Sequence, residues 1–272
     1  MLGNATVACR LAPTCRRCSR HERCCHLAQR FQGLFTILLS TYYCSLLAIL
    51  YSLIPYNCAM VFTTIFFDLD DTLYPAASGL WPALKARMNQ YMIERMHFPA
   101  EDVPGLREKY FREYGTTLRG LQARHKIDTQ DFLAYVHDVN LTDYIQPDPL
   151  QQSMLASLPT RNFIFTNSDI NHARRVLRVL QIEEYFADIV DVTRIDPYCK
   201  PNPESFALAL KVAGESTPSK CIMIDDLPTT TKAAKALGLY SILFGAAVSN
   251  GDSDATISDW RQLPTLLNGN GF

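Results

Sequence analysis

Three carboxylates crowd into four residues directly after an apolar run. Residues 63–67 are Thr-Thr-Ile-Phe-Phe, and Asp68, Asp70 and Asp71 follow at once. A short run of aromatic and β-branched residues that ends in polar ones predicts a buried strand. In parallel α/β sheets, ligands bind just beyond the carboxyl ends of the strands. Because carboxylates at such a place repel one another unless a cation or a shared proton intervenes, Asp68 and Asp70 are candidate chemical groups.

Polar side chains also follow other predicted strands. These strands are expected at residues 161–166, 189–192, 221–224 and 240–244. The polar groups near their carboxyl ends are Thr166, Asn167, Ser168, Lys200, Asp225 and Asp226. Carboxylate oxygens suit Mg²⁺, which keeps several waters and holds substrate phosphates. Lysine supplies a compact positive charge for phosphate oxygens, so the combined set predicts a site for a metal ion and a phosphate group.

Helical patterns alternate with these strands. Asp169 is predicted to begin a helix through residue 180, and further helices are expected at 204–213 and 229–237, with a final short one capped by Ser258. This alternation predicts an α/β fold with a doubly wound parallel sheet. Residues 77–158 have helical patterns throughout, with Asp128 as one cap. Since so long a stretch exceeds a plain crossover, it predicts an inserted helical cap after the first strand.

The predicted organisation is therefore a core of residues 61–76 and 159–272, a cap at 77–158 and an N-terminal extension at 1–60. Only two of the nine cysteines, Cys199 and Cys221, lie beyond residue 60, so we expect no disulfide framework and a reducing, cytoplasmic location for the core. The net charge of −1 gives no support for nucleic-acid binding.

The order Asp-x-Asp, Thr, Lys, Asp-Asp resembles the haloacid dehalogenase-like (HAD) superfamily of phosphohydrolases from residue 63 to about residue 244. Closer resemblance is to its pyrimidine 5′-nucleotidase branch. The stretches that carry this likeness are Tyr74-Pro75, residues 114–121, residues 165–168 with His172-Ala173, and Lys200-Pro201-Asn202-Pro203. One departure is Thr230, where members of the branch often carry Asn.

The resemblance implies a role for each motif residue. Asp68 would attack phosphorus and become phosphorylated, while Asp70 would protonate the leaving alkoxide and then activate water. Mg²⁺ would be held by Asp68, the Asp70 backbone carbonyl and Asp225, with support from Asp226. The phosphoryl oxygens would be bound by Thr166, Asn167 and Lys200.

Other residues carry weaker expectations. We expect a raised pKa for Asp70, because of burial under the cap and the neighbouring carboxylates. His172 is expected to face solvent or to cap its helix locally. Tyr114, Thr116 and Thr117 are candidates for leaving-group recognition from the cap, although helix packing and turn roles explain them equally well.

The implied substrate is a small phosphate ester, with a pyrimidine nucleoside 5′-monophosphate favoured and a sugar phosphate or phosphoglycolate as alternatives. Dehalogenation is disfavoured because Asp70 is present, and a P-type ATPase because Lys-Thr-Gly does not follow Asp68. A phosphomutase would reuse Asp68 and Asp70 and differ only in its cap. An alternative of another class is a non-catalytic, membrane-tethered binding module.

The first sixty residues differ in composition from the rest. They contain six Arg, one Glu and seven cysteines, and residues 34–54 hold no charge over a length that could span a bilayer core of about 30 Å. A membrane anchor, a leader peptide and an over-extended start before Met60 remain alternatives. A Cys-His cluster at residues 15–26 lacks the long loop between ligand pairs found in zinc folds, which disfavours a zinc site.

Overall fold

The structure is a computed structural model that describes residues 62–245 and 251–269. The predictions for residues 1–60, including the apolar segment 34–54 and the Cys-His cluster, lie outside these ranges. Among the helices that the structure describes, none combines the length and the apolar character needed to cross a bilayer.

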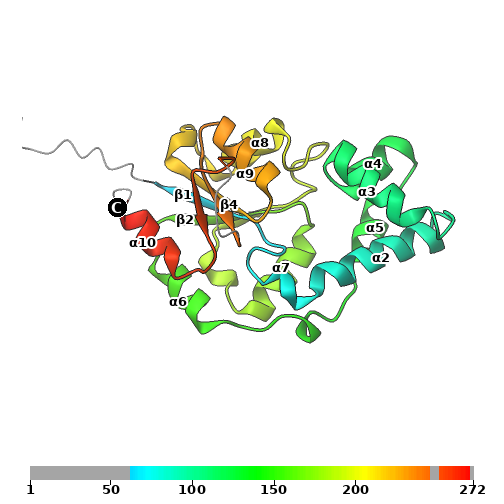
Figure 1. Cartoon of the computed structure of the whole chain (residues 1–272), viewed down its shortest axis with the longest axis horizontal. Helices are drawn as coiled ribbons and strands as arrows, with labels where there is room; N and C mark the ends of the chain where they lie inside the picture. Colours follow the sequence, from blue (N-terminus) through cyan, green and yellow to red (C-terminus); the bar gives the residue numbers. More distant parts are fainter. Residues whose placement is uncertain (1–61, 246–250, 270–272) are drawn as a thin grey trace, which may run out of the picture. The chain divides into compact units, whose positions relative to one another are not determined.

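A six-stranded parallel sheet forms the centre of the fold (Figure 1). Its strands are β1 (Thr64–Phe67), β2 (Arg161–Phe165), β3 (Asp188–Val190), β4 (Cys221–Asp225), β5 (Tyr240–Phe244) and β6 (Ala255–Ile257). Their order is β3-β2-β1-β4-β5-β6, so β1 lies in the middle and the chain winds outward from it in both directions. The predicted doubly wound parallel α/β fold is confirmed, and β6 is a three-residue strand that the sequence patterns did not predict.

Side chains of the central strand alternate between two apolar layers. Ile65 and Phe67 belong to one buried cluster and Phe66 to the other, as the two-residue period of a strand requires. Helices α6 (Pro149–Ser157), α7 (Ile170–Leu180) and α10 (Gln262–Gly269) contribute to the first layer, and α8 (Pro203–Ala213) and α9 (Pro228–Ala236) to the second (Figure 1). Because both faces are covered, the strands are apolar over most of their length, with polar residues mainly at their ends.

Asp169 caps α7 as predicted, since its carboxylate accepts hydrogen bonds from the backbone of Asn171 and His172. The prediction for the last helix is wrong by one turn. Helix α10 begins at Gln262, and the backbone N–H of Ser258 donates to the Gln262 side chain at 2.8 Å instead of Ser258 capping the helix. Short 3₁₀ turns complete the set at Ala76–Ser78, Leu141–Asp143, Glu183–Tyr185 and Pro218–Lys220.

Four helices of the insertion have an apolar core of their own. They are α2 (Leu80–Glu94), α3 (Val103–Tyr114), α4 (Thr117–Arg124) and α5 (Thr129–Val136), and their buried side chains include Tyr91, Tyr110 and Phe132. Leu141, Ile145, Met154 and Leu155 instead join the cluster against the sheet. The packing therefore places the end of the predicted 77–158 cap, including α6, with the core.

Helices α3 and α4 approach closely at Gly120. A Cβ at this position would lie 2.3 Å from Cβ of Tyr110, which is part of the neighbouring helix and cannot move aside. Only glycine therefore allows this contact, and the two helices pack as a pair in the cap.

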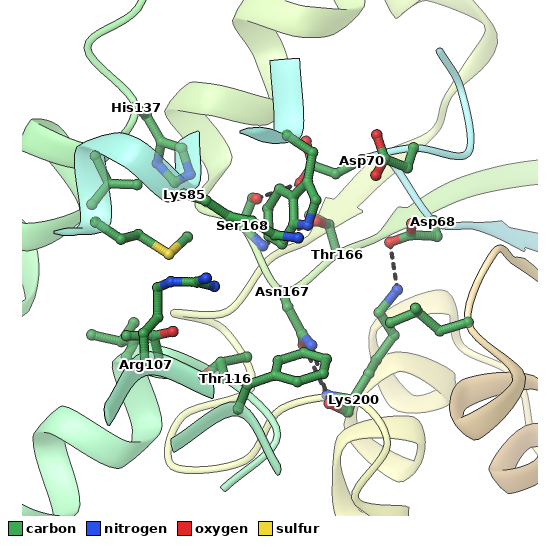
Figure 2. A pocket seen from close by; sticks show the side chains of 18 of the residues that line it. Asp68, Asp70, Lys85, Arg107, Thr116, His137, Thr166, Asn167, Ser168 and Lys200 are labelled. Atoms are coloured by element: carbon green, nitrogen blue, oxygen red, sulfur yellow. Dashed lines mark hydrogen bonds and ion pairs between the residues drawn. The ribbon is translucent and has the colours of Figure 1, made fainter. Parts of the chain in front are cut away.

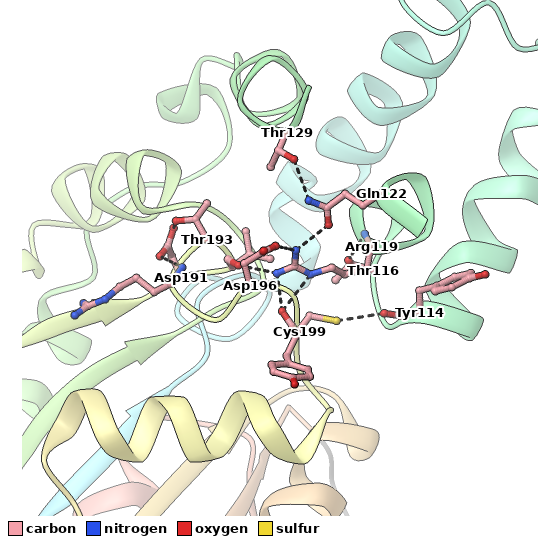
Figure 3. A network of polar contacts seen from close by, with 12 residues as sticks. Tyr114, Thr116, Arg119, Gln122, Thr129, Asp191, Thr193, Asp196 and Cys199 are labelled. Atoms are coloured by element: carbon pink, nitrogen blue, oxygen red, sulfur yellow. Dashed lines mark hydrogen bonds and ion pairs between the residues drawn. The ribbon is translucent and has the colours of Figure 1, made fainter. Parts of the chain in front are cut away.

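Arg119 of α4 fastens the cap to the core (Figure 3). Its guanidinium donates to the carbonyl oxygens of Val192 at 2.8 Å and of Tyr198 at 2.6 Å and 3.1 Å, and pairs with the carboxylate of Asp196. The side chain is only 7% exposed. Buried carbonyls and a buried cation thus satisfy one another, which ties α4 to the loop that follows β3.

Loss of this cation should destabilise the protein. We expect Arg119→Met to lower the free energy of unfolding by about 3 kcal/mol, because two carbonyl groups lose a charged donor in a buried place. Asp196→Asn should cost less than about 1 kcal/mol, since the Asp196 side chain is 58% exposed and its pair with Arg119 is screened by water. Urea denaturation of both variants measures the difference, and equal midpoints for the two would contradict this view of the contact.

Candidate active site

The sheet brings the predicted polar residues to one edge. Strands β1 and β4 are neighbours in register, with Phe67 opposite Ile224, so Asp68 and Asp225 come next to one another directly after. The backbone N–H of Asp68 donates to the carbonyl of Ile224 at 2.9 Å. Thr166 follows β2 on the other side of β1. A cavity between this edge and the cap is lined by Asp68, Asp70, Thr166, Asn167, Lys200, Asp225 and Asp226 (Figure 2).

Lys200 lies between two carboxylates. Its Nζ is 2.6 Å from Oδ1 of Asp68 and 2.7 Å from Oδ2 of Asp225, and its side chain is 4% exposed. Burial disfavours the charged ammonium, but the carboxylates of Asp225 and Asp68 outweigh burial and raise the pKa of Lys200 above its ordinary value. The lysine is therefore a permanent positive charge in the cavity.

The side chain of Asn167 holds the loop that carries Lys200. Its Oδ1 accepts from the Lys200 backbone N–H at 2.8 Å, and its Nδ2 donates to the Lys200 carbonyl at 3.0 Å (Figure 2). The predicted phosphate ligand thus uses its side-chain oxygen and one amide N–H for positioning, which leaves the second amide N–H and the backbone N–H for an anion. Thr166 is oriented as well, because its hydroxyl oxygen accepts from the backbone N–H of Ser168 at 3.0 Å.

Asp68, Asp225 and Asp226 each offer a carboxylate oxygen, and these oxygens lie within 4.8 Å of one another. Burial raises the pKa of Asp68 well above its usual range; Lys200 opposes this effect, and Asp225 and Asp226 add to it. Burial, with the Asp225 charge, also raises the pKa of Asp226 to about 7. Three carboxylates against one ammonium leave a surplus of negative charge, and their hard oxygen donors fit a divalent cation such as Mg²⁺.

Asp70 is held differently from its neighbours. Oδ1 of Asp70 accepts from the Tyr74 hydroxyl at 2.7 Å and lies 3.0 Å from Nε2 of His172, while Oδ2 accepts from the Ser168 hydroxyl at 2.5 Å. Burial alone would raise the pKa of Asp70, but His172 and the two hydroxyl donors outweigh it and hold that pKa below the usual range. The predicted raised pKa is therefore wrong for this arrangement, because donors to the ionised form surround the carboxylate.

The expectation that His172 faces solvent is also wrong. His172 is 1% exposed, and its ring stacks on that of His137 with centroids 4.2 Å apart. Nδ1 of His137 in turn lies 2.5 Å from Oδ2 of Asp169. His137 ends the cap helix α5, so the stacked pair connects the cap to Asp70. The available sequence signal was that His172 falls in the first turn of the helix after β2, near the edge where ligands bind.

The three cap residues predicted to recognise the leaving group divide into two groups. Thr116 and Thr117 line the cavity, and Thr116 also caps α4 by accepting from the Arg119 backbone N–H at 3.1 Å. Tyr114 lies outside the cavity, and its hydroxyl oxygen accepts a hydrogen bond from Nε of Arg124 at 2.5 Å.

Further cap residues line the cavity, although they were not predicted as site residues from the sequence. They are Trp81, Lys85, Met88, Arg107, Phe111, Phe132, Leu133, Val136 and His137. Thr230, buried at the start of α9, lines the core side.

Comparison with known proteins assigns the family. The family model for haloacid dehalogenase-like hydrolases matches residues 62–238, and the chain belongs to this family. "Phosphate metabolism protein 8" of Saccharomyces cerevisiae is 27% identical over 192 residues, which are 65% of this chain and 60% of that protein. The chain thus spans less than two thirds of the length of this curated relative.

Solved structures have the same fold. The HAD phosphatase of Thermococcus onnurineus is 14% identical, with a TM-score of 0.54 over 77% of this chain and 100% of its own. YfnB of Bacillus subtilis, crystallised with magnesium, is 17% identical, with a TM-score of 0.50 over 76% of this chain and 99% of its own. At these identities the likeness concerns the fold, and the chain is a hydrolase by its family.

A divalent cation should stabilise the protein in a pH-dependent way. The folded-state pKa of Asp226 is about 7, above its unfolded value, so the metal-free fold loses stability as pH rises from about 4 through about 7. We expect Mg²⁺ to raise the Tm more at about pH 8 than at about pH 6, where it must displace a proton. Thermal unfolding with and without Mg²⁺ measures this shift. Asp226→Asn should flatten the pH dependence, and an equal Mg²⁺ effect at both pH values would contradict the prediction.

Proposed function

We propose that the chain is a Mg²⁺-dependent phosphomonoesterase that works through a phosphorylated Asp68. The observation that carries the proposal is the buried Asp68 carboxylate, 2.6 Å from the Lys200 ammonium and beside two further metal-ligand carboxylates. The name of the yeast relative, the Thermococcus phosphatase and the magnesium in YfnB support the same chemistry. A protein that merely binds ligands would not need to gather a nucleophile, an acid and a phosphate cradle.

In the first step, an Asp68 oxygen attacks phosphorus and the bond from phosphorus to the ester oxygen breaks. Lys200 and the Thr166 hydroxyl bind the phosphoryl oxygens, where charge accumulates. Thr166 can donate its proton to the phosphoryl group, since its own oxygen already accepts from Ser168. A magnesium ion held by Asp68, Asp225, Asp226 and the Asp70 backbone carbonyl would supply positive charge against the repulsion between carboxylates and phosphate.

Asp70 moves the proton in both steps. It gives a proton to the leaving oxygen, and then takes one from the water that attacks the phosphorylated Asp68 and releases phosphate. Because its carboxylate is ionised in the metal-free, ligand-free arrangement, it must take up a proton from solvent when the substrate enters. A phosphate dianion placed beside Asp70 raises its pKa by charge repulsion, which supplies the acid where it is needed.

The substrate class that we propose is a small phosphate ester, with a pyrimidine nucleoside 5′-monophosphate as the first candidate. The motifs at residues 114–121 and 200–203 support the nucleotidase branch. The aromatic side chains of Trp81, Phe111 and Phe132 line the cavity and offer faces on which a flat base can pack. Sugar phosphates and phosphoglycolate are the competing substrates.

Phosphate release tests the reaction directly. On a panel of nucleoside monophosphates, sugar phosphates and phosphoglycolate, we expect turnover that requires Mg²⁺ and is highest with UMP or CMP. Asp68→Asn should reduce kcat by at least about 10³-fold, because no covalent intermediate can form. The exposed carboxylate of Asp138 offers a matched control, and Asp138→Asn should leave turnover unchanged. Retained activity in Asp68→Asn would refute the mechanism, whereas preference for sugar phosphates would refute only the substrate.

The contact between His172 and Asp70 predicts an effect that depends on the leaving group. An alkyl oxygen needs a proton from Asp70 as it departs, but a p-nitrophenyl oxygen does not. The His172 ring also orients the Asp70 carboxylate, and loss of this orientation should outweigh the easier protonation of Asp70. We therefore expect His172→Ala to slow single-turnover cleavage of an alkyl phosphate about 10²-fold more than that of p-nitrophenyl phosphate. His172→Gln, which keeps a donor, should recover part of the loss. Equal slowing of both substrates would mean that His172 only maintains the fold.

A further inference from the structure

Two cap helices present matching pairs of side chains to the cavity. Trp81 and Lys85 lie four residues apart on α2, and Arg107 and Phe111 lie four residues apart on α3, so each pair shares one helix face. All four residues line the cavity that contains Asp68 and Lys200. Figure 2 shows Lys85 and Arg107 extending into it from the cap side. Each helix thus offers one aromatic surface and one cation.

Unlike Arg119, which pairs with Asp196, Lys85 and Arg107 form no ion pair within the described residues. Nε of Arg107 donates to Oδ1 of Asn89 at 3.1 Å, which orients the guanidinium. Lys85 lies with its Nζ 5.5 Å from the centre of the Trp81 ring. Within residues 62–245 and 251–269, neither cation has a carboxylate partner within 4.0 Å. Both are half-buried, so part of the water that would solvate them is excluded.

Two carboxylates line the cavity near these cations without forming an ion pair with them in the described part of the chain. On the cap side, the exposed Glu108 lines the cavity next to Arg107 in sequence. On the core side, Asp71 lies near enough to Lys85 to feel its charge. Of the other cap side chains that line the cavity, Met88, Leu133 and Val136 are apolar, and Thr116, Thr117 and His137 are polar. An anion that enters this part of the cavity therefore meets two incompletely solvated cations in a setting of low polarity, where attraction is strong.

We infer that Lys85 and Arg107 form a subsite for a second negative charge on the leaving group of the substrate. The inference rests on the proposed phosphatase function and narrows its substrate class to phosphomonoesters that also carry a carboxylate or another phosphate. The phosphoryl group that is cleaved occupies the sheet edge at Lys200 and Thr166, so the organic part extends toward the cap. Trp81 and Phe111 bind a flat or apolar portion of it, and the two cations bind the anionic portion.

Matched substrate pairs test the subsite. Orotidine 5′-monophosphate differs from UMP by a carboxylate, and 3-phosphoglycerate differs from glycerol 3-phosphate by a carboxylate in place of an alcohol. In the unmodified protein we expect a higher kcat/KM for the anionic member of a pair. Lys85→Met and Arg107→Met should each reduce this preference about 10-fold, through KM, and leave the other member within about twofold. Lys109→Met is the matched control, because Lys109 is exposed on α3 and outside the cavity.

Two results would overturn the subsite. If both members of each pair lose activity together, the cations act on the transferred phosphate or on the fold. If the ratio is the same in all variants, the cations do not contact the leaving group.

A binding measurement on an inactive variant tests the subsite independently of the proposed reaction. Calorimetric titration of Asp68→Asn protein with orotidine 5′-monophosphate and with UMP should give tighter binding of the former, and the added Lys85→Met change should remove the difference. Discrimination in binding without any turnover by the unmodified protein would refute the phosphatase and support the subsite. Equal binding of the two nucleotides would refute the subsite whatever the turnover.

Discussion

The buried contact of the Lys200 ammonium with Asp68 and Asp225 is the interaction on which the rest of the site depends. Each carboxylate comes from a different central strand, and only the adjacency of β1 and β4 places them on either side of one cation. Burying these charges is costly unless each has a partner. The position of Lys200 is fixed by two further contacts. The amide of Asn167 hydrogen-bonds the Lys200 backbone, and Arg119 of the cap donates to the carbonyl of Tyr198 in the same loop.

Asp68 and Asp70 lie two residues apart in the sequence, but their side chains have opposite environments. Asp68 is buried and Asp226 is half-buried, and neighbouring carboxylates favour a proton or a metal ion on both. Asp70 instead accepts hydrogen bonds from Tyr74 and Ser168 and lies against His172, which favours its ionised form. In the metal-free, ligand-free arrangement these directions are the reverse of what a nucleophile and a general acid require. In the proposed reaction, a cation beside Asp68 would favour its ionised form, and the substrate phosphate beside Asp70 would favour its protonated form.

Core and cap have separate tasks in the proposed enzyme. The sheet edge supplies the groups that act on phosphorus, whereas the cap supplies aromatic and cationic groups around the leaving group. Two contacts connect the parts: Arg119 holds α4 to the loop after β3, and His137 at the end of α5 stacks on His172. Because the second contact leads directly to Asp70, the position of the cap and the orientation of the acid–base residue are linked. A change in the cap that displaces His137 is therefore expected to affect the proton transfer by Asp70 as well as substrate recognition.

The sequence by itself determined the succession of most strands and helices along the chain and the polar residues that follow the strands. Hydrophobic periodicity and helix caps are local signals, so they can be recognised without the tertiary structure. It therefore predicted the parallel fold and the set Asp68, Asp70, Thr166, Lys200 and Asp225. It missed β6, the burial of His172, the lowered pKa of Asp70 and the cavity positions of Lys85 and Arg107. Only the tertiary structure decided these features, since each depends on which distant segments face one another, and no local pattern of residues records that.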